Sequence, residues 1–181
     1  YYANAIDNLK AVDISFDALK NEILDGRKRT FVRADMFNYD DFIYFDGDIQ
    51  GSMNVGGLIG KAGGSEINIV GTTGKVKGEE EVGGLIGSTG SMITNAFSVN
   101  VVKGFEDVGG AVGYYTGSLS FIKNVYSASL LKGRNDVKGL VGYPHLNTLS
   151  NCYFDSTITG HSSEEGRTTA EMLMKNTYEG F

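Results

Sequence analysis

The hexapeptide at residues 55–60, VGGLIG, returns three times further along the chain and decides the fold. It recurs as VGGLIG at 82–87, as VGGAVG at 108–113 and as VKGLVG at 137–142. A copy therefore begins every 26 to 29 residues, and self-similarity at such a period is the sequence signature of a repeat protein.

Two further segments repeat in the same register. One is an Asn followed by two apolar residues, at 68–70, 95–97, 124–126 and 151–153. The other is a short strand-like segment that ends in Gly, at 48–51, 75–78, 101–104, 130–133 and 157–160. Each period thus holds three short segments, which are too short for a pair of helices. We predict an all-β fold, a right-handed parallel β-helix in which each coil contacts only its neighbours.

Equivalent residues of successive coils in such a stack lie about 4.8 Å apart and form columns. Strand side chains alternate between the two faces, so each column has a predicted direction. One inward column is expected at Ile49, Val76, Val102, Leu131 and Ile158, and a second at Ile69, Ala96, Val125 and Cys152. The residues after the first column are expected to point outward: Gln50, Lys77, Lys103, Lys132 and Thr159. Cys152 is therefore expected to be a core residue rather than a nucleophile.

Three other columns carry expectations of their own. The four Asn residues (Asn68, Asn95, Asn124 and Asn151) predict a hydrogen-bonded ladder at a turn. Beside them, a mostly aromatic column is expected to stack: Val70, Phe97, Tyr126 and Tyr153. The second Gly of the hexapeptide never varies, which predicts close packing or a left-handed dihedral angle at Gly57, Gly84, Gly110 and Gly139. The first Gly is replaced by Lys138 in the last copy, so its position is expected to face solvent.

The four hexapeptides, with the N-A-F-S and N-V-Y-S segments between them, resemble the GLUG repeat family. The resemblance covers about residues 45–181 and departs from the pattern at Ala111 and Lys138. That family occurs in bacterial surface adhesins and in non-catalytic regions of secreted immunoglobulin A proteases. The resemblance implies an extracellular location at the cell surface and a role in adhesion, and it supplies no catalytic residues.

Three regions follow from the extent of the repeats. Residues 1–44 show no repeat and are expected to form an N-terminal cap or the end of a preceding module, residues 45–160 the solenoid, and residues 161–181 a C-terminal capping helix and loop. Thr168 and Glu171 have the spacing of a capping box that opens a helix. Met172, Leu173, Tyr178 and Phe181 are expected to lie across the last coil.

The composition excludes several classes of partner. The 181 residues carry a formal net charge of −6, whereas nucleic-acid binding requires clustered Lys and Arg. No apolar run approaches the roughly 20 residues that span a bilayer, so membrane insertion is not expected. A single cysteine excludes an internal disulfide.

Acidic residues precede the Val of three hexapeptides, at Glu81, Asp107 and Asp136, and Asn54 precedes the first. Stacked carboxylates about 5 Å apart repel by about 0.9 kcal/mol even in a water-like dielectric, so lysines or a cation must offset them. Calcium suits a corner rich in oxygen atoms, but the spacing of a calcium-binding loop is absent. A solvated edge of mixed charge is the main expectation, and a calcium site at these three acids is the weaker one.

No catalytic arrangement is expected, because the carboxylates occupy repeated positions and His145 and His161 lie in separate segments. Tyr114, Tyr115 and Tyr143 follow the later hexapeptides, and tyrosine offers a flat face and a polar tip for recognition. These tyrosines either bind a ligand or simply cover the corner. Two functions remain open: a binding module for a glycan or protein of a host surface, and a structural spacer or fibre segment, including a phage-like appendage that self-associates.

Overall fold

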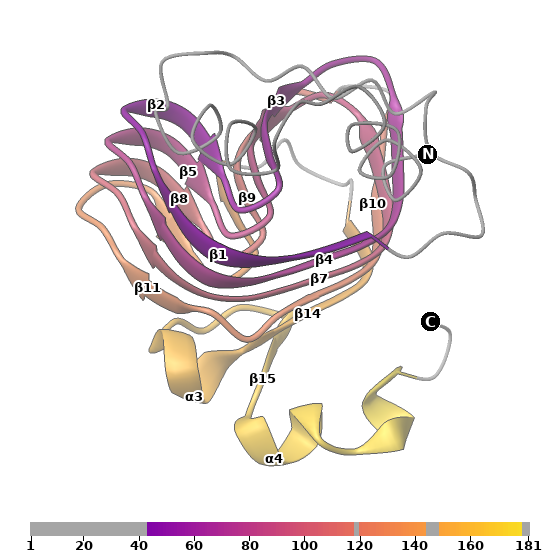
Figure 1. Ribbon diagram of the computed structural model, residues 1–181. Helices are drawn as coiled ribbons and strands as arrows, with labels where there is room; N and C mark the ends of the chain where they lie inside the picture. The colour runs from indigo at the N-terminus through magenta and orange to yellow at the C-terminus, as the bar shows by residue number, and fades with distance from the viewer. Residues whose placement is uncertain (1–42, 118–119, 144–148, 179–181) are drawn as a thin grey trace.

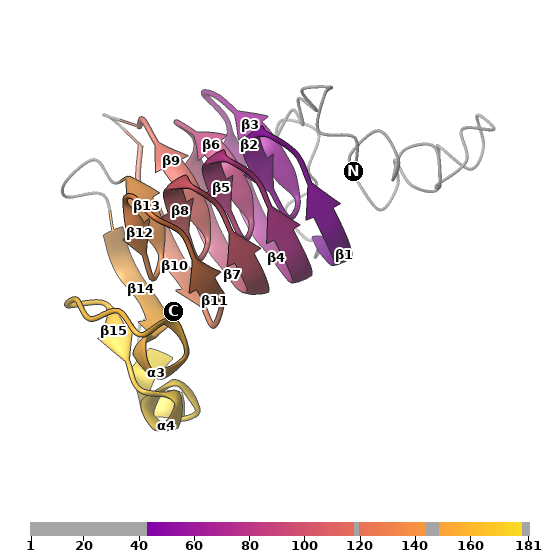
Figure 2. The same cartoon turned by 90° about the vertical axis from the view of Figure 1, so that its left-hand side faces the viewer.

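The computed structural model describes residues 43–117, 120–143 and 149–178, so the expected N-terminal cap, His145 and Phe181 lie outside the described residues. The described chain forms a parallel β-helix whose coils stack along one axis, as Figures 1 and 2 show. Three sheets run along this axis, and every strand pair in them is parallel. The predicted fold class is confirmed.

Each coil contributes one strand or more to a long sheet and one strand to each of two shorter sheets. The long sheet contains β1 (Ile43–Gln50), β4 (Glu66–Lys77), β7 (Met92–Lys103), β10 (Ile122–Ser127), β14 (Leu149–Asp155) and β15 (Gly166–Arg167), and β11 (Leu130–Lys132) also pairs with β7. The second sheet contains β2 (Met53–Gly56), β5 (Glu80–Gly83), β8 (Glu106–Gly109) and β12 (Val137–Lys138). The third sheet contains β3 (Ile59–Ala62), β6 (Ile86–Thr89), β9 (Val112–Tyr115) and β13 (Val141–Tyr143).

The hexapeptide forms a corner between the second and third sheets that turns inward toward the long sheet (Figure 1). A Cβ atom on Gly84 would lie 2.2 Å from the carbonyl oxygen of Gly110, and one on Gly110 would lie 2.1 Å from that of Gly139. Neither glycine has a positive φ, so close packing between coils explains the invariant second Gly.

The expectation that the first Gly of the hexapeptide faces solvent is wrong in the first three copies. Gly56, Gly83 and Gly109 are buried, and a Cβ atom on Gly83 would lie 2.0 Å from the carbonyl oxygen of Ile86. Lys138 takes this position in β12, which is the edge strand of the second sheet, and its side chain is exposed.

The inward corner divides the core into two apolar clusters. The smaller one lies between the long sheet and the second sheet and contains Ile49, Val55, Val76, Val82, Val102 and Val108. The larger one includes residues of the long and third sheets, among them Ile67, Val70, Ile86, Ile93, Val112 and Val125. The predicted inward column of Ile49, Val76 and Val102 is confirmed, and the following residues Gln50, Lys77, Lys103 and Lys132 are exposed, as predicted.

Polar side chains of the long sheet, and of the segment between β10 and β11, hydrogen-bond to the inward corner. This contact lies between the two apolar clusters. The side-chain amide of Asn100 donates to the Thr72 hydroxyl at 2.9 Å and to the Gly84 carbonyl oxygen at 3.0 Å. The Ser129 hydroxyl donates in the same way to the Gly110 carbonyl oxygen at 3.2 Å. Buried carbonyl groups need such donors, so these polar residues satisfy the inward corner.

The first Asn segment is shifted by one residue from the predicted alignment. Val70 pairs with Ala96 and Asn68 with Thr94, so Ile69 is the residue opposite Asn95. The inward residue in this coil is therefore Val70 rather than Ile69, and Gly71 rather than Val70 belongs to the aromatic column. The hydrogen bonds of the Asn ladder are confirmed, because the amides of Asn95, Asn124 and Asn151 each donate to the Asn of the preceding coil, at 2.9, 2.9 and 3.4 Å. These residues lie within β7, β10 and β14, however, and not at a turn between strands.

This shift leaves Ile69 in a left-handed conformation, with φ of 54°, like Asn95 at 52°. A β-branched residue is strained there, whereas Asn tolerates the conformation. We expect Ile69→Asn to raise the free energy of unfolding by about 1 kcal/mol in urea denaturation. The reverse change, Asn95→Ile, should lower it by a similar amount, and a destabilised Ile69→Asn variant would contradict the assigned strain.

The last copy of the segment that ends in Gly, at 157–160, does not form a strand. Asp155 accepts hydrogen bonds from the backbone N–H groups of Thr157 and Ile158, at 2.9 and 3.0 Å, and begins the short helix α3 (Ser156–Thr159). Ile158, expected inside, is consequently 39% exposed, and Thr159, expected outside, is buried. The chain turns out of the coil because this cap competes with continued strand pairing.

Residues 166–178, called the tail below, lie on the outer side of the long sheet and do not cover the last coil (Figure 2). Its helix α4 (Thr169–Met172) opens with the predicted capping box of Thr168 and Glu171 and is followed by the 3₁₀ helix η2 (Lys175–Tyr178). Neither helix contains a buried residue, and Leu173 is 83% exposed. The expectation that Leu173 covers the last coil is therefore wrong.

Candidate functional site

The structure separates the three tyrosines that were predicted to act together. Tyr115 is fully buried in the larger cluster, where its hydroxyl donates to the Ser91 carbonyl oxygen at 3.1 Å. It points inward because its partners in the register, Thr89 and Ala62, occupy the inward column of the third sheet. Tyr115 is thus a core residue, and its prediction as a ligand-binding residue is wrong.

Tyr114 and Tyr143 do come together on the outer side of the third sheet. They pair in the register of β9 and β13, and their rings stack with centroids 5.3 Å apart and planes at 11°. Tyr143 is 45% exposed. The two rings use their facing surfaces on each other, so a ligand at this position would meet mainly ring edges and hydroxyl groups.

A longer aromatic column runs along the outer side of the long sheet. Phe97 and Tyr126 stack with centroids 5.5 Å apart, and Tyr44 lies 6.2 Å from Phe97 on the other side. Gly71 provides the space for this contact, because a Cβ atom there would lie 2.3 Å from the Phe97 ring. The predicted stacking of Phe97 and Tyr126 is confirmed.

The tail continues this aromatic column at its C-terminal end. Tyr178 packs edge-on against Tyr126 and Tyr153, with centroids 5.9 and 6.1 Å apart. The guanidinium group of Arg167 lies 4.8 Å from the centre of the Tyr153 ring, within the range of a cation–π contact. The tail is therefore held to the solenoid by aromatic contacts as well as by the pairing of β15 with β14.

A second apolar group lies on the same face and was not predicted from the sequence. Val99 and Leu130 are 39% and 51% exposed, and Val101 is partly exposed beside Leu130 in the register. The signal that identifies them is an inverted alternation in β7, where the polar Ser98 and Asn100 are buried while the apolar residues between and after them face outward. The polar residues point inward because they bind the inward corner.

The acidic residues Glu81, Asp107 and Asp136 form one column with Asn54, as the pairing of the adjacent valines requires. All four have a positive φ, between 46° and 56°. The Glu81 Oε2 and Asn54 Oδ1 atoms are buried without a hydrogen-bond partner among the described residues. Within the described ranges, however, no three His, Cys, Asp or Glu side chains are grouped so that they could hold a metal ion, so the weaker expectation of a calcium site is not supported.

Crowding in this column changes the acidity of Asp107. Burial, followed by the charges of Asp136, Glu106, Glu81 and Glu80, raises the pKa of Asp107 from 3.8 to about 6. The folded chain therefore holds this proton more tightly than the unfolded chain does. The free energy of unfolding should fall as the pH rises from about 4 to about 6, because ionised Asp107 is disfavoured only in the folded state.

We expect Asp107→Asn to raise the free energy of unfolding by about 1 kcal/mol at pH 8 and to have little effect at pH 4. This value allows for solvent screening of a side chain that is only partly buried. Asn also suits the φ of 51° at this position. Urea denaturation at both pH values measures the difference. Glu164→Gln removes the same charge from an exposed residue outside the column, and an equal gain at pH 8 in that variant would show that net charge, not the column, is responsible.

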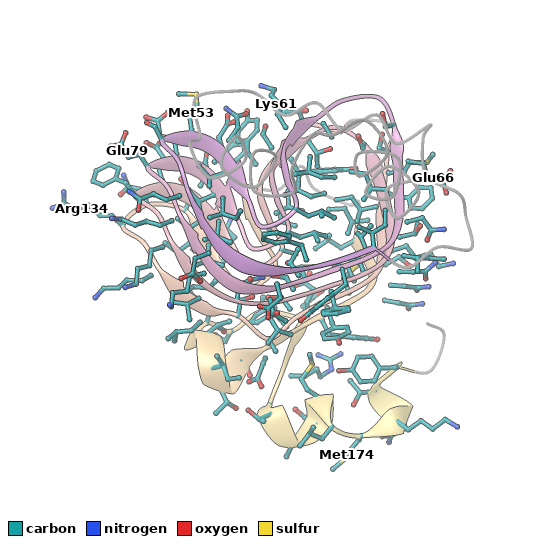
Figure 3. The ribbon with its side chains drawn as sticks, viewed as in Figure 1. Met53, Lys61, Glu66, Glu79, Arg134 and Met174 are labelled. Carbon is teal, nitrogen blue, oxygen red and sulfur yellow. The ribbon has the colours of Figure 1, made fainter. Side chains whose placement is uncertain are left out.

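The mixed edge beside this column is solvated, as predicted. Glu79 and Arg134 lie in the turns that connect the long sheet to the second sheet, and both project outward (Figure 3). The Arg134 guanidinium group lies 5.6 Å from the centre of the Phe105 ring. Lys77, Lys103 and Lys132 form an exposed column on the adjacent end of the long sheet, and the ion pairs of the described residues do not include them.

Cys152 is buried, as predicted, and its thiol contacts the carbonyl oxygens of Ile122 and Ser150 at 3.4 and 3.2 Å. Burial raises the pKa of this thiol to about 11, which keeps it protonated and unreactive at neutral pH.

A pocket of about 270 Å³ lies at the C-terminal end of the solenoid. Apolar residues of the last coil, including Leu140, Val141 and Phe154, form much of its lining, and Lys138 and His161 also contact it. It marks the end of the stack, where the core side chains of the last coil have no further coil above them within the described residues.

None of the helices in the described part of the chain is long and apolar enough to cross a membrane. Comparison of the chain with protein-family models, with curated proteins and with solved structures gives no match.

Proposed function

We propose that this chain is a non-catalytic binding module of a bacterial surface or secreted protein, and that it attaches to a glycan or protein of a host surface. One observation carries this proposal. Side chains of the three sheets fill the interior of the coils, while exposed aromatic and apolar side chains gather in register on the outer faces. Recognition by such a solenoid takes place along stacked columns on its lateral surface.

The extracellular location and the adhesive role rest on the resemblance of the hexapeptides to the GLUG family. The geometry adds a physical reason for binding without catalysis. The acidic residues occupy equivalent positions in successive coils, and the single thiol is buried and protonated. Residues that repeat in this way serve the stack, whereas catalysis requires one singular arrangement of groups.

Arrays of host glycans and host surface proteins, probed with the chain and with its Tyr114→Ser/Tyr143→Ser variant, test the proposal. We expect the unmodified chain to bind at least one ligand. Both tyrosines lie on the surface, so the variant should fold and serves to map the binding face. Turnover of a polysaccharide or peptide by the unmodified chain would contradict the proposal.

A structural spacer or fibre segment is the second candidate. The open C-terminal end of the stack favours it, because β12 and β13 are edge strands of their sheets and have no strand beyond them within the described residues. Edge strands of this kind can pair with another chain. A chain that binds nothing on the arrays but forms end-to-end oligomers in sedimentation experiments would establish this candidate instead.

A further inference from the structure

We propose that the outer face of the long sheet is a docking surface for an extended, acidic polypeptide segment that carries aromatic side chains. This inference rests on the proposed binding function and names the class of partner and the face that it contacts. The surface consists of an apolar patch, defined here as Val99, Val101, Tyr126 and Leu130, together with the lysine column of Lys77, Lys103 and Lys132.

The apolar patch places exposed aliphatic side chains next to one another on the outer face. Val99 is 39% exposed and Leu130 is 51% exposed, and they lie on neighbouring coils. In β7 the polar residues Ser98 and Asn100 are buried instead. Contiguous exposed apolar surface is typical of interaction sites, and this observation supports a partner at the patch.

The patch ends where the outer face becomes polar and the polar side chains pair with one another. In the first two coils, Tyr44 hydrogen-bonds to Thr73 at 2.6 Å, Thr73 donates to Asp46 at 2.8 Å, and Lys75 pairs with Asp48 at 3.1 Å. On the opposite side the tail stands out from the sheet (Figure 2). The partner must therefore fit between this polar area and the tail, which favours an extended segment over a second globular surface.

The aromatic column favours a polypeptide over a sugar. Phe97 and Tyr126 stack with planes at 13°, so their facing surfaces are occupied by each other. A pyranose ring binds best on a free aromatic face, whereas an aromatic side chain also packs edge-on. The chain itself provides an example, because Tyr178 packs edge-on against Tyr126 at 62° and Tyr153 at 79°. We infer that an aromatic side chain of the partner packs edge-on in the same manner, beside the exposed Val99 and Leu130.

The lysine column supplies the preference for acidic partners. Lys77 pairs in register with Lys103, and Lys103 with Lys132, so their ammonium groups follow the solenoid axis at steps of about 4.8 Å. Lys75 has an ion-pair partner in Asp48, but within the described ranges no carboxylate pairs with these three lysines. Their field acts over about 8–10 Å at physiological salt, so it selects a partner locally although the whole chain is acidic.

A random copolymer of glutamate and tyrosine is the probe, titrated against the full chain at low salt and followed by calorimetry. We expect it to bind more tightly than polyglutamate, and a copolymer of lysine and tyrosine not to bind. Val99→Ser/Leu130→Ser should weaken binding about tenfold, and Lys103→Gln/Lys132→Gln about fivefold with a smaller salt dependence. The matched control Lys61→Gln/Lys138→Gln removes two exposed lysines from the other sheets and should leave binding within about twofold.

Four results would overturn the inference. Binding that is equal in the patch variants, the lysine variants and the control would remove the outer face from recognition. Polygalacturonate that binds as tightly as the copolymer would make the partner an acidic glycan. A dimer that dissociates in Val99→Ser/Leu130→Ser would make the occupant a second copy of the chain. A ligand on the arrays with no copolymer binding would overturn this inference alone, because the proposed function requires only that the chain bind a host surface.

Discussion

Replacing Val102 by Asp is expected to abolish cooperative folding of the solenoid at neutral pH. The Val102 side chain has no exposed surface and lies in the smaller cluster with Val76 and Val108. A carboxylate there would have neither solvent nor a charged partner, and an unpaired buried charge costs several kcal/mol. A loss of about 4 kcal/mol or more is a large part of the stability of a domain of this size. Thermal melts followed by circular dichroism measure it.

The matched control is Lys103→Glu, one residue further along the same strand. Lys103 is exposed, so this charge reversal should change the free energy of unfolding by less than about 1 kcal/mol. An equal loss in the free energy of unfolding from the two substitutions would mean that Val102 and Lys103 do not point to opposite faces of β7.

The fold is predictable because the repeat states the same information several times. The valines of the hexapeptide recur every 26 to 29 residues, and the structure pairs Val55, Val82, Val108 and Val137 in one sheet. Because each column has several members, one deviating residue does not hide the direction in which the column points. A parallel stack also leaves no choice of strand order, since each coil must pair with the coils adjacent to it in sequence.

Single positions were predicted less well, because strand alternation can slip by one residue without changing the period. The segment that begins at Asn68 contains one residue more before its inward Val70 than the later coils do, so Ile69 takes the left-handed position of Asn95. A slip of one residue exchanges the two faces of a strand. The Asn ladder survives because the Asn68 side chain reaches the Asn95 amide from the neighbouring position.

The candidate site was the hardest part to predict, because exposure depends on the path of the chain around each corner. Tyr114 and Tyr115 are adjacent in sequence and look equivalent, yet one lies outside and the other is fully buried. The apolar patch was missed for a related reason. Buried Ser98 and Asn100 have a role only beside the inward corner, and the sequence does not show that the hexapeptide turns toward the long sheet.

That inward corner leads to the second large effect, which is expected for Gly110→Ala. The added Cβ atom would lie 2.1 Å from the Gly139 carbonyl oxygen of the next coil and 2.3 Å from the Ser127 hydroxyl oxygen. A carbonyl oxygen of the backbone cannot move aside as the end of a side chain can, so adjacent coils must separate at the corner.

We expect Gly110→Ala to lower the free energy of unfolding by about 3 kcal/mol or more, measured by urea denaturation. The control Gly63→Ala places its Cβ atom in open space, with no atom within 4 Å, and should change stability by less than about 0.5 kcal/mol. Both variants make the same change in composition, so a difference between them isolates the contact between coils. A Gly110→Ala variant as stable as Gly63→Ala would mean that the corner does not press the coils together, and the invariant second Gly of the hexapeptide would then require another cause.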